Sequence, residues 1–149
     1  MIEGIPLPLT GDPLDEPFWQ AALRGELVVQ QCGGCSRMRF PPRPMCPHCR
    51  STERGWKAVS GRGKVWSFVV PHPPLLPSFT PIAPYNVIVV ELDEDPSLRM
   101  VGNIVACEGA GINSVDAAAI EIGAAVRVVF DKIADDVVLP RWTPDGRRG

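Results

Sequence analysis

The amino-acid sequence predicts a mainly β protein: a short helix near the N-terminus, a small cysteine-rich ribbon, and then a five-stranded barrel. Three observations support this fold class. Two C-x-x-C pairs are separated by ten residues in the first third of the 149-residue chain. Five short runs rich in valine and isoleucine follow from residue 64 onward, bounded by Gly, Pro or Asp. Ahead of the cysteines, apolar residues recur at helical spacing for about ten residues.

Length and composition restrict the class of protein. A chain of 149 residues fits one ordinary domain or two small ones. With 45% hydrophobic and 21% charged residues it is not a disordered chain, and its net charge of -2 argues against a polycation that coats nucleic acid. We expect no membrane span and no signal peptide, because no run approaches about 20 apolar residues and the N-terminus is acidic and rich in proline. The expected compartment is the cytoplasm, where cysteines are more often metal ligands or free thiols than disulfides.

The chain divides into three expected regions: an extended arm (1–14), a helix with a zinc ribbon (15–62), and a barrel with a C-terminal tail (63–149). Asp15 and Glu16 precede Pro17, which is typical of a helix start, and Gly25 can end the helix. Such a short helix needs a docking surface. Phe18 and Trp19 pack either on their own domain, which we favour, or on a partner.

The cysteine pairs are the sharpest signal, and they predict a structural zinc site. Two C-x-x-C turns that face each other bring four thiolates to one point, the tetrahedral set that structural zinc takes. A redox dithiol is the weaker alternative, since it needs only one pair. Gly33 and Gly34 are expected to supply positive φ angles in the first turn. His48 lies between two ligands but is not needed. The predicted ligands are Cys32, Cys35, Cys46 and Cys49.

The second half predicts an OB-fold, a partly open barrel of five strands, although another small barrel fits the same periodicity. Residues 113–122 are expected to form a short helix or turn before the fourth strand, and the acidic stretch 93–96 a hairpin turn. Cys107 follows an apolar run and is expected to be a small buried core residue. The expected strands are 64–70, 86–92, 99–105, 126–130 and 137–140.

No catalytic constellation is evident, so we expect no catalytic residue. His72 lies in a stiff loop, 71–85, in which six of fifteen residues are proline. It is a surface histidine, a partner or ligand contact, or, least favoured, a general base, because no nucleophile is paired with it. The loop's apolar side chains suggest an interface or a channel wall. The contact residues expected in and beside this loop are His72, Leu75, Leu76, Phe79 and Tyr85.

Charge is distributed unevenly. Residues 24–66 hold nine basic and two acidic side chains, whereas residues 85–136 hold three basic and ten acidic ones. Arg39, Arg43 and Arg62 can meet the phosphates of a CoA ester or an acidic partner, or lie on a solvated surface. Nucleic acid is disfavoured, since the barrel strands combine Trp66, Phe68 and Phe130 with almost no positive charge.

The segment from Phe18 to Trp142 resembles a known family. The stretches FWQAALRGELVVQQCGGCSRMRFPPRPMCPHCRS, GRGKVWSFVV, VELDEDPSLRMVGNIV, GAAVRVVF and LPRWTP occur in the order of the zinc-ribbon plus OB-fold acyl-CoA-associated family, long filed as a domain of unknown function. The four-cysteine block around Phe40-Pro41-Pro42 is the specific part. The segment from Cys107 to Gly123 departs from the pattern in length.

The resemblance implies a helper subunit without catalytic activity of its own. Its partner would be a thiolase-like protein that performs the acyl-CoA chemistry, and a MaoC-type hotdog hydratase is a second implied partner. The first specific expectation is the acyl-CoA aldolase of steroid side-chain degradation, a carbon–carbon lyase; acyl transfer and hydroxymethylglutaryl-CoA synthesis are further settings. The alternative is a zinc-ribbon OB-fold module that binds single-stranded nucleic acid.

Overall fold

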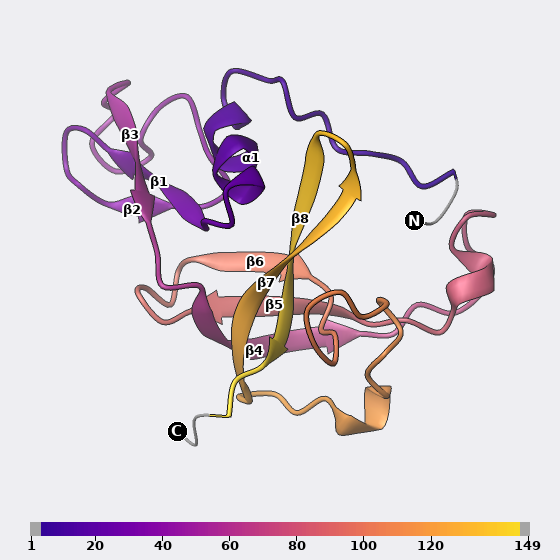
Figure 1. Ribbon diagram of the computed structural model, residues 1–149. Helices are drawn as coiled ribbons and strands as arrows, with labels where there is room; N and C mark the ends of the chain where they lie inside the picture. Colours follow the sequence, from indigo (N-terminus) through magenta and orange to yellow (C-terminus); the bar gives the residue numbers. More distant parts are fainter. Residues whose placement is uncertain (1–3, 147–149) are drawn as a thin grey trace.

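The computed structural model describes residues 4–146 and contains two antiparallel sheets and one α-helix (Figure 1). The outer ends of the expected arm and tail, residues 1–3 and 147–149, lie outside the described residues. A three-stranded sheet, ordered β2-β1-β3, forms the ribbon, and a five-stranded sheet, ordered β6-β5-β4-β7-β8, forms the barrel. The elements are α1 (Glu16–Leu23), β1 (Val28–Cys32), β2 (Met38–Arg39), β3 (Arg54–Ala58), β4 (Arg62–Val69), η1 (Thr80–Ile82), β5 (Val87–Leu92), β6 (Arg99–Gly102), η2 (Ala117–Ala119), β7 (Ala125–Ala134) and β8 (Val137–Pro144).

The helix α1 lies between the ribbon and the barrel and packs against β1 and β8. The backbone N–H of Leu14 donates to the side chain of Asp12 just before the helix, and Pro17 occupies its first turn. Phe18 is only 7% exposed, and its ring centroid lies 5.4 Å from that of Phe40 in the ribbon. The expectation that this helix docks on its own chain is therefore correct: Phe18 belongs to the core, and the half-buried Trp19 packs against it.

Ribbon, helix and barrel share one hydrophobic core. Buried side chains of α1 and β1, such as Phe18 and Val29, belong to the same cluster as Val65, Ile88 and Trp142 of the barrel. The ribbon is thus not a separate module on a linker. The start of β1 and the helix pack on the barrel core, while the four cysteines lie together where β1 ends, at Cys32.

The barrel closes where β6 meets β8. The sheet runs through β5, β4 and β7 in between, with a bulge in β4 between Val65 and Ser67. Just beyond β6, Ile104 forms a parallel bridge with Trp142. The N–H of Val105 donates to the carbonyl of Trp142 at 2.7 Å, and the N–H of Trp142 donates to the carbonyl of Asn103 at 3.0 Å. These contacts join the two ends of the sheet, so the predicted OB-fold outline is confirmed.

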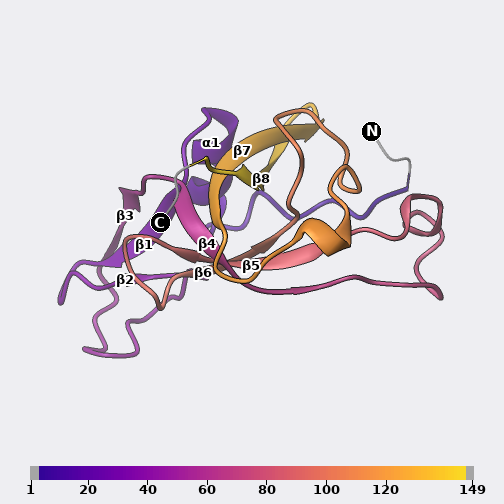
Figure 2. The same cartoon turned by 90° about the horizontal axis from the view of Figure 1, so that it is seen from below.

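Several details differ from the expectation. The ribbon has a third strand, β3, whose sequence RGWKA has too little apolar alternation to be recognised. The strands β7 and β8 are longer than expected and form a twisted hairpin that crosses the sheet (Figures 1 and 2). Residues 113–122 contain one short 3₁₀ turn, η2, whose Asp116 carboxylate accepts a hydrogen bond from the N–H of Ala118. Cys107 is exposed, so the expectation that it is a core residue is wrong.

The barrel has little room for a side chain at Gly63. A Cβ there would lie 2.4 Å from the carbonyl oxygen of Glu91 on the neighbouring strand. We expect Gly63→Ala to lower the free energy of unfolding by about 1–3 kcal/mol, because strand β5 must move. Gly55→Ala is the matched control, since no atom lies within 4 Å of its added Cβ. Thermal unfolding of both variants checks this, and equal melting temperatures would contradict it.

Candidate functional site

The four expected metal ligands meet at the tip of the ribbon. All four sulfur atoms lie within 4.8 Å of one another, with Cys32 and Cys49 sulfurs 3.5 Å apart and Cys35 and Cys46 sulfurs 3.7 Å apart. Zinc at about 2.3 Å from each of four tetrahedral sulfurs requires sulfur–sulfur distances of roughly 3.8 Å. The four cysteines therefore fit a tetrahedral zinc ion with little movement.

Two similar turns, which we call knuckles (residues 32–36 and 46–50), present these sulfurs. In the first, the N–H of Ser36 donates to the carbonyl of Cys32; in the second, the N–H of Arg50 donates to the carbonyl of Cys46. Ser36 and Arg50 each have a positive φ, of 63° and 64°. The matching geometry explains why equal C-x-x-C spacing brings the two pairs to one point.

The expectation that Gly33 and Gly34 supply positive φ angles is wrong, because those angles fall on the residues that follow each C-x-x-C pair. The two glycines serve a different purpose. A Cβ on Gly33 would lie 2.8 Å from the Cβ of Glu53, and a Cβ on Gly34 would lie 3.1 Å from the Cys49 sulfur. Glycine at these positions lets the first knuckle approach Cys49 of the second knuckle and Glu53, which follows it in the chain.

Backbone hydrogen bonds prepare the thiolates. The N–H of Cys35 donates to the Cys32 sulfur at 3.4 Å and lowers the pKa of Cys32 to about 6, although burial opposes this. The backbone N–H of Cys49 lowers the pKa of Cys46 in the same way. The backbone N–H of Ser51 acts to lower the pKa of Cys49, but the neighbouring thiols raise it to about 11. One sulfur of each knuckle, that of Cys32 and that of Cys46, thus loses its proton most readily, whereas all four sulfurs are ligands once zinc binds.

The three arginines that were expected to contact phosphate have different surroundings. They are Arg39, Arg43 and Arg62. Arg39 is half-buried, and its Nε donates to the side-chain oxygen of Gln30, which also accepts from the N–H of Arg43 at 2.8 Å. Gln30 is itself buried, so this cluster fixes the loop that leads to the second knuckle. The side chains of Arg43 and Arg62 are exposed, with Arg62 4.0 Å from the Asp145 carboxylate.

The proline-rich loop lies far from the ribbon. Both ribbon views place the loop, with its turn η1, at the opposite end of the molecule from β1–β3 (Figures 1 and 2). His72 and Leu76 are exposed, while Leu75 is half-buried. Phe79 and Tyr85 stack with ring centroids 5.6 Å apart. With residues of the N-terminal arm, they line a groove of about 640 Å³ that extends to the tip of the β7–β8 hairpin.

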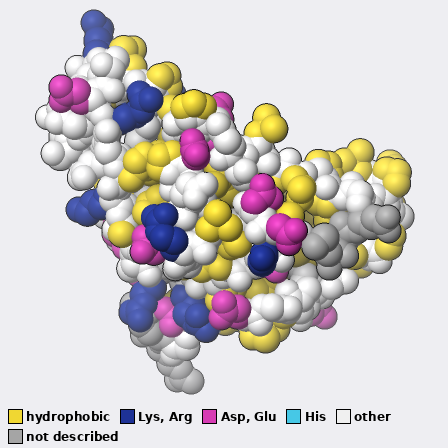
Figure 3. Space-filling view, turned by 45° about the horizontal axis from the view of Figure 1, so that its top comes forward, with side chains coloured by type: hydrophobic (Ala, Val, Ile, Leu, Met, Phe, Trp, Pro, Cys, Tyr) yellow, Lys and Arg dark blue, Asp and Glu magenta, His cyan; other side chains and the backbone are white. Residues whose placement is uncertain are grey.

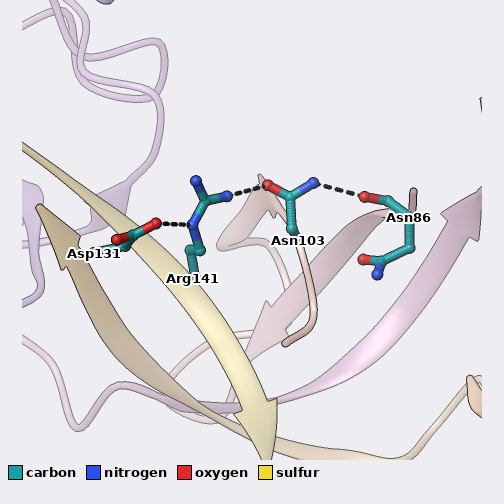
Figure 4. Close-up of polar contacts among 4 residues, drawn as sticks. All are labelled: Asn86, Asn103, Asp131 and Arg141. Carbon is teal, nitrogen blue, oxygen red and sulfur yellow. Dashed lines mark hydrogen bonds and ion pairs between the residues drawn. The ribbon is translucent and has the colours of Figure 1, made fainter. Parts of the chain in front are cut away.

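We call the region where β6 and β8 face each other the seam (residues 99–105 and 139–142). A row of polar side chains crosses this seam. The Asp131 carboxylate accepts a hydrogen bond from Nε of Arg141, and Nη1 of Arg141 donates to the Asn103 side-chain oxygen, each at 2.6 Å. The Asn103 amide then donates to the carbonyl of Asn86 (Figure 4). Arg141 is only 9% exposed, and its charge is balanced by Asp131. Side chains thus connect β8 to the residue that precedes β5, beside the backbone bridge of Trp142 with Asn103.

Sequence reasoning did not single out any member of this row. A signal was present: Arg141 interrupts the apolar run VVLPRWTP, and a charged residue inside a barrel strand needs a buried partner. Asn86 is also buried, and its side-chain oxygen accepts from the N–H of Ile104 at 2.7 Å. The partners lie 10 to 38 residues apart in sequence, so no local pattern reveals them.

Beside this row lies a mainly apolar slot of about 360 Å³. Its walls come from α1, the Phe40–Pro42 segment, β6 and β8. Figure 3, which faces α1 and the β7–β8 hairpin, shows apolar side chains across the middle of the molecule among scattered basic and acidic ones. The residues of β6 and β8 that line the slot are Met100, Val101, Gly102, Leu139, Pro140, Arg141 and Trp142.

Comparison with known proteins decides the family. Residues 19–53 match the family described as "ChsH2, rubredoxin-like zinc ribbon domain", and residues 56–131 match "ChsH2, C-terminal OB-fold domain". The chain belongs to the ChsH2 zinc-ribbon and OB-fold family. Because the four cysteines of this ChsH2-type ribbon also have the geometry for zinc, the site is a structural zinc site.

The curated relatives described here are named either as hydratase subunits or as a scaffold protein. A "Probable enoyl-CoA hydratase alpha subunit" of Thermomonospora curvata is 36% identical over 87% of this chain, and the "3-oxo-4,17-pregnadiene-20-carboxyl-CoA hydratase alpha subunit" of Mycobacterium tuberculosis is 34% identical over 86%. The chain spans 37% of the length of each. A "DUF35 domain-containing scaffold protein" of Methanocaldococcus jannaschii is 35% identical over 74% of this chain and 71% of its own length.

A solved structure is similar over the whole ChsH2 unit. A chain of the "Ltp2-ChsH2(DUF35) aldolase" superposes with a TM-score of 0.78 at 32% identity, covering 92% of this chain and 98% of that chain. The similarity thus includes both the zinc ribbon and the barrel. Within the part of the chain that the structure describes, no helix is long and apolar enough to cross a membrane.

The zinc site supports the ribbon directly. We expect Cys46→Ser to lose bound zinc and to unfold the ribbon, because a structural metal site contributes its binding free energy to folding. The exposed Cys107 offers the matched control, Cys107→Ser, which should keep both zinc and melting temperature. Metal analysis and thermal unfolding provide the readouts. Full zinc content in the Cys46→Ser protein would refute this role.

The polar row across the seam depends on the planar guanidinium group of Arg141, which donates hydrogen bonds to two partners. Arg141→Lys keeps the charge but cannot reach Asp131 and Asn103 with the same planar geometry, so we expect a loss of about 1–3 kcal/mol in stability. Arg127→Lys, on the neighbouring strand β7 and exposed, should change little. Urea unfolding measures the free energy of unfolding of both variants. If both lose stability equally, or if neither does, the polar row does not have the stabilising role described here.

Proposed function

We propose that this chain is a non-catalytic auxiliary subunit of an acyl-CoA-processing complex and that it binds a thiolase-like enzyme. The observation that carries the proposal is its similarity, over 92% of its length, to a chain of the Ltp2-ChsH2(DUF35) aldolase. A relative named as a scaffold protein supports the same role. The zinc site adds no catalytic centre, because four protein sulfurs leave no coordination position for substrate.

The specific reaction that we propose for the complex is acyl-CoA aldol cleavage in steroid side-chain degradation. The similar solved structure is named as an aldolase, and the name of the Mycobacterium tuberculosis relative contains a steroid-derived CoA ester. The relatives named as hydratase alpha subunits support a MaoC-type hotdog hydratase as a second partner, fused to such a segment or beside it. The proposed compartment is the cytoplasm, where reduced thiols remain available to zinc.

Two surfaces are available for partner and ligand contacts in this proposal. The proline-rich loop presents His72 and the 59%-exposed Leu76 at one end of the molecule, beside the groove that contains Phe79 and Tyr85. A loop stiffened by proline loses little conformational entropy on binding. At the other end, Arg43 and Arg62 offer positive charge to a CoA phosphate or an acidic partner.

Binding of single-stranded nucleic acid is the competing function, and the barrel surface disfavours it. Trp66 is an exposed aromatic residue on β4, but the Arg99 guanidinium already lies 3.8 Å from its ring centroid. Lys64 on the same strand lies 3.7 Å from the Glu91 carboxylate. Single-stranded nucleic acid needs a free aromatic ring for base stacking and a free basic side chain for its phosphates, whereas the Trp66 ring and the Lys64 side chain already have partners.

Co-expression tests the proposed function. The chain should form a stable complex with a thiolase-like protein from its own genome, and aldol cleavage of a steroid side-chain acyl-CoA should require both proteins. Size-exclusion chromatography and an assay of the separate and combined proteins measure this. A chain that stays monomeric and binds single-stranded DNA tightly, with strong salt dependence, would overturn the proposal in favour of the alternative.

A further inference from the structure

The guanidinium group of Arg141 has one nitrogen atom that the polar row does not use. Its Nε donates to Asp131 and its Nη1 donates to Asn103. Among residues 4–146, Nη2 has no hydrogen-bond partner, and Figure 4 shows it pointing away from both partners of the row. Arg141 is only 9% exposed, yet the completely buried polar atoms that lack a partner all belong to other residues. One cationic hydrogen-bond donor of the row therefore remains accessible.

The groove of about 640 Å³ is the larger hollow that Arg141 lines, together with its two partners in the row. Ligand pockets for small molecules are typically about 300–1,000 Å³ in volume, mainly apolar, and contain a few polar groups that fix orientation. This groove has the same composition, since apolar side chains from the N-terminal arm, the proline-rich loop and the β7–β8 hairpin surround the polar row. They include Leu7, Phe79, Tyr85, Ile112, Ile133 and Leu139.

The charges around Arg141 favour a neutral oxygen atom as the ligand group. The Asp131 carboxylate lies 2.6 Å from Nε of Arg141, so the pair has no net charge. A ligand carboxylate at Nη2 would also lie near this carboxylate and be repelled by it, whereas a ketone oxygen accepts the hydrogen bond without adding a charge. Lys132 is the other basic residue of the groove, and it is exposed. The groove thus fits an apolar molecule with a neutral acceptor.

We propose that this groove binds the fused rings of a steroid, with Nη2 of Arg141 donating a hydrogen bond to a ketone oxygen on the rings. A steroid has a rigid, mainly apolar body, so it loses little conformational entropy on binding. This inference rests on the proposed function, because it assigns one part of the proposed acyl-CoA substrate to a surface of this chain. The cleavage reaction itself stays with the thiolase-like enzyme.

The chain contains one tyrosine, Tyr85, and this residue lines the groove, so labelled tyrosine gives a single NMR reporter of binding. The full zinc-loaded chain is titrated with 3-oxo-4-androstene-17β-carboxylate and with 4-androstene-17β-carboxylate, which lacks the ketone. We expect the ketone probe to shift the Tyr85 signals with a dissociation constant on the order of micromolar. Removal of the ketone should weaken binding about tenfold, because the bond to the charged Arg141 is lost.

Two alanine substitutions test the location of the site. Ala110→Phe places a ring in the groove and should weaken binding of the ketone probe at least tenfold. Ala118→Phe is the matched control, because Ala118 is exposed in η2 and does not line the groove. It should bind like the original chain. If Ala110→Phe does not fold, the comparison of the two probes on the original chain decides.

Three results would overturn the inference: unchanged Tyr85 signals with the ketone probe, equal affinity for both probes, or undiminished binding by folded Ala110→Phe. Complex formation and aldol cleavage test the proposed function separately. If the complex forms and cleaves its substrate but the isolated chain binds no steroid, the inference is wrong and the proposed function stands. If the chain binds the ketone probe as expected but forms no complex with the thiolase-like protein, the groove is a steroid site and the proposed function is wrong.

Discussion

The structure depends on how the two ends of a five-stranded sheet meet. A closed barrel needs the two edge strands of its sheet to pair. Among the described residues, the backbone hydrogen bonds between β8 and the chain at the end of β6 are those of Trp142 with Asn103 and Val105. Pro140 prevents the next backbone bond. Three features compensate along the rest of the seam: the helix α1, the Phe40–Pro42 segment, and the polar row from Asp131 to Asn86. A buried arginine is acceptable there because every step of the row is hydrogen-bonded.

This arrangement explains why the zinc ribbon cannot be separated from the barrel. The ribbon supplies Phe40, which packs on Phe18 of α1, and α1 in turn packs on β8. Zinc fixes the two knuckles and so holds the segment that carries Phe40 and Arg39. A small, metal-stabilised ribbon thereby positions one wall of the seam slot. A stable surface of this kind suits the proposed role of an auxiliary subunit that binds a larger enzyme.

Much of the fold was accessible from sequence because its signals are local. The spacing of Cys32, Cys35, Cys46 and Cys49 predicted the metal site, and valine-rich runs predicted the five barrel strands. Features that depend on tertiary contacts were missed. The strand β3 has little apolar alternation, the ends of β7 and β8 contain polar residues such as Asp131, and the pairing of Arg141 with Asn103 joins distant segments. The glycines of the first knuckle were assigned the wrong reason, because close approach to Glu53 and Cys49 is visible only in three dimensions.

The central claim is that the backbone pairing of β8 with β6 stops at Pro140, so that the amide of Val101 has no hydrogen-bond partner among the described residues. Residue-resolved hydrogen exchange of the isolated chain tests it most directly. The amides of Val105 and Trp142, which form the bridge, should be strongly protected, as should those of Met100 and Gly102, which face β5. The amides of Arg99 and Val101 should exchange rapidly. Protection of Val101 in the isolated chain equal to that of Trp142 would show that this amide is already hydrogen-bonded and would contradict the account.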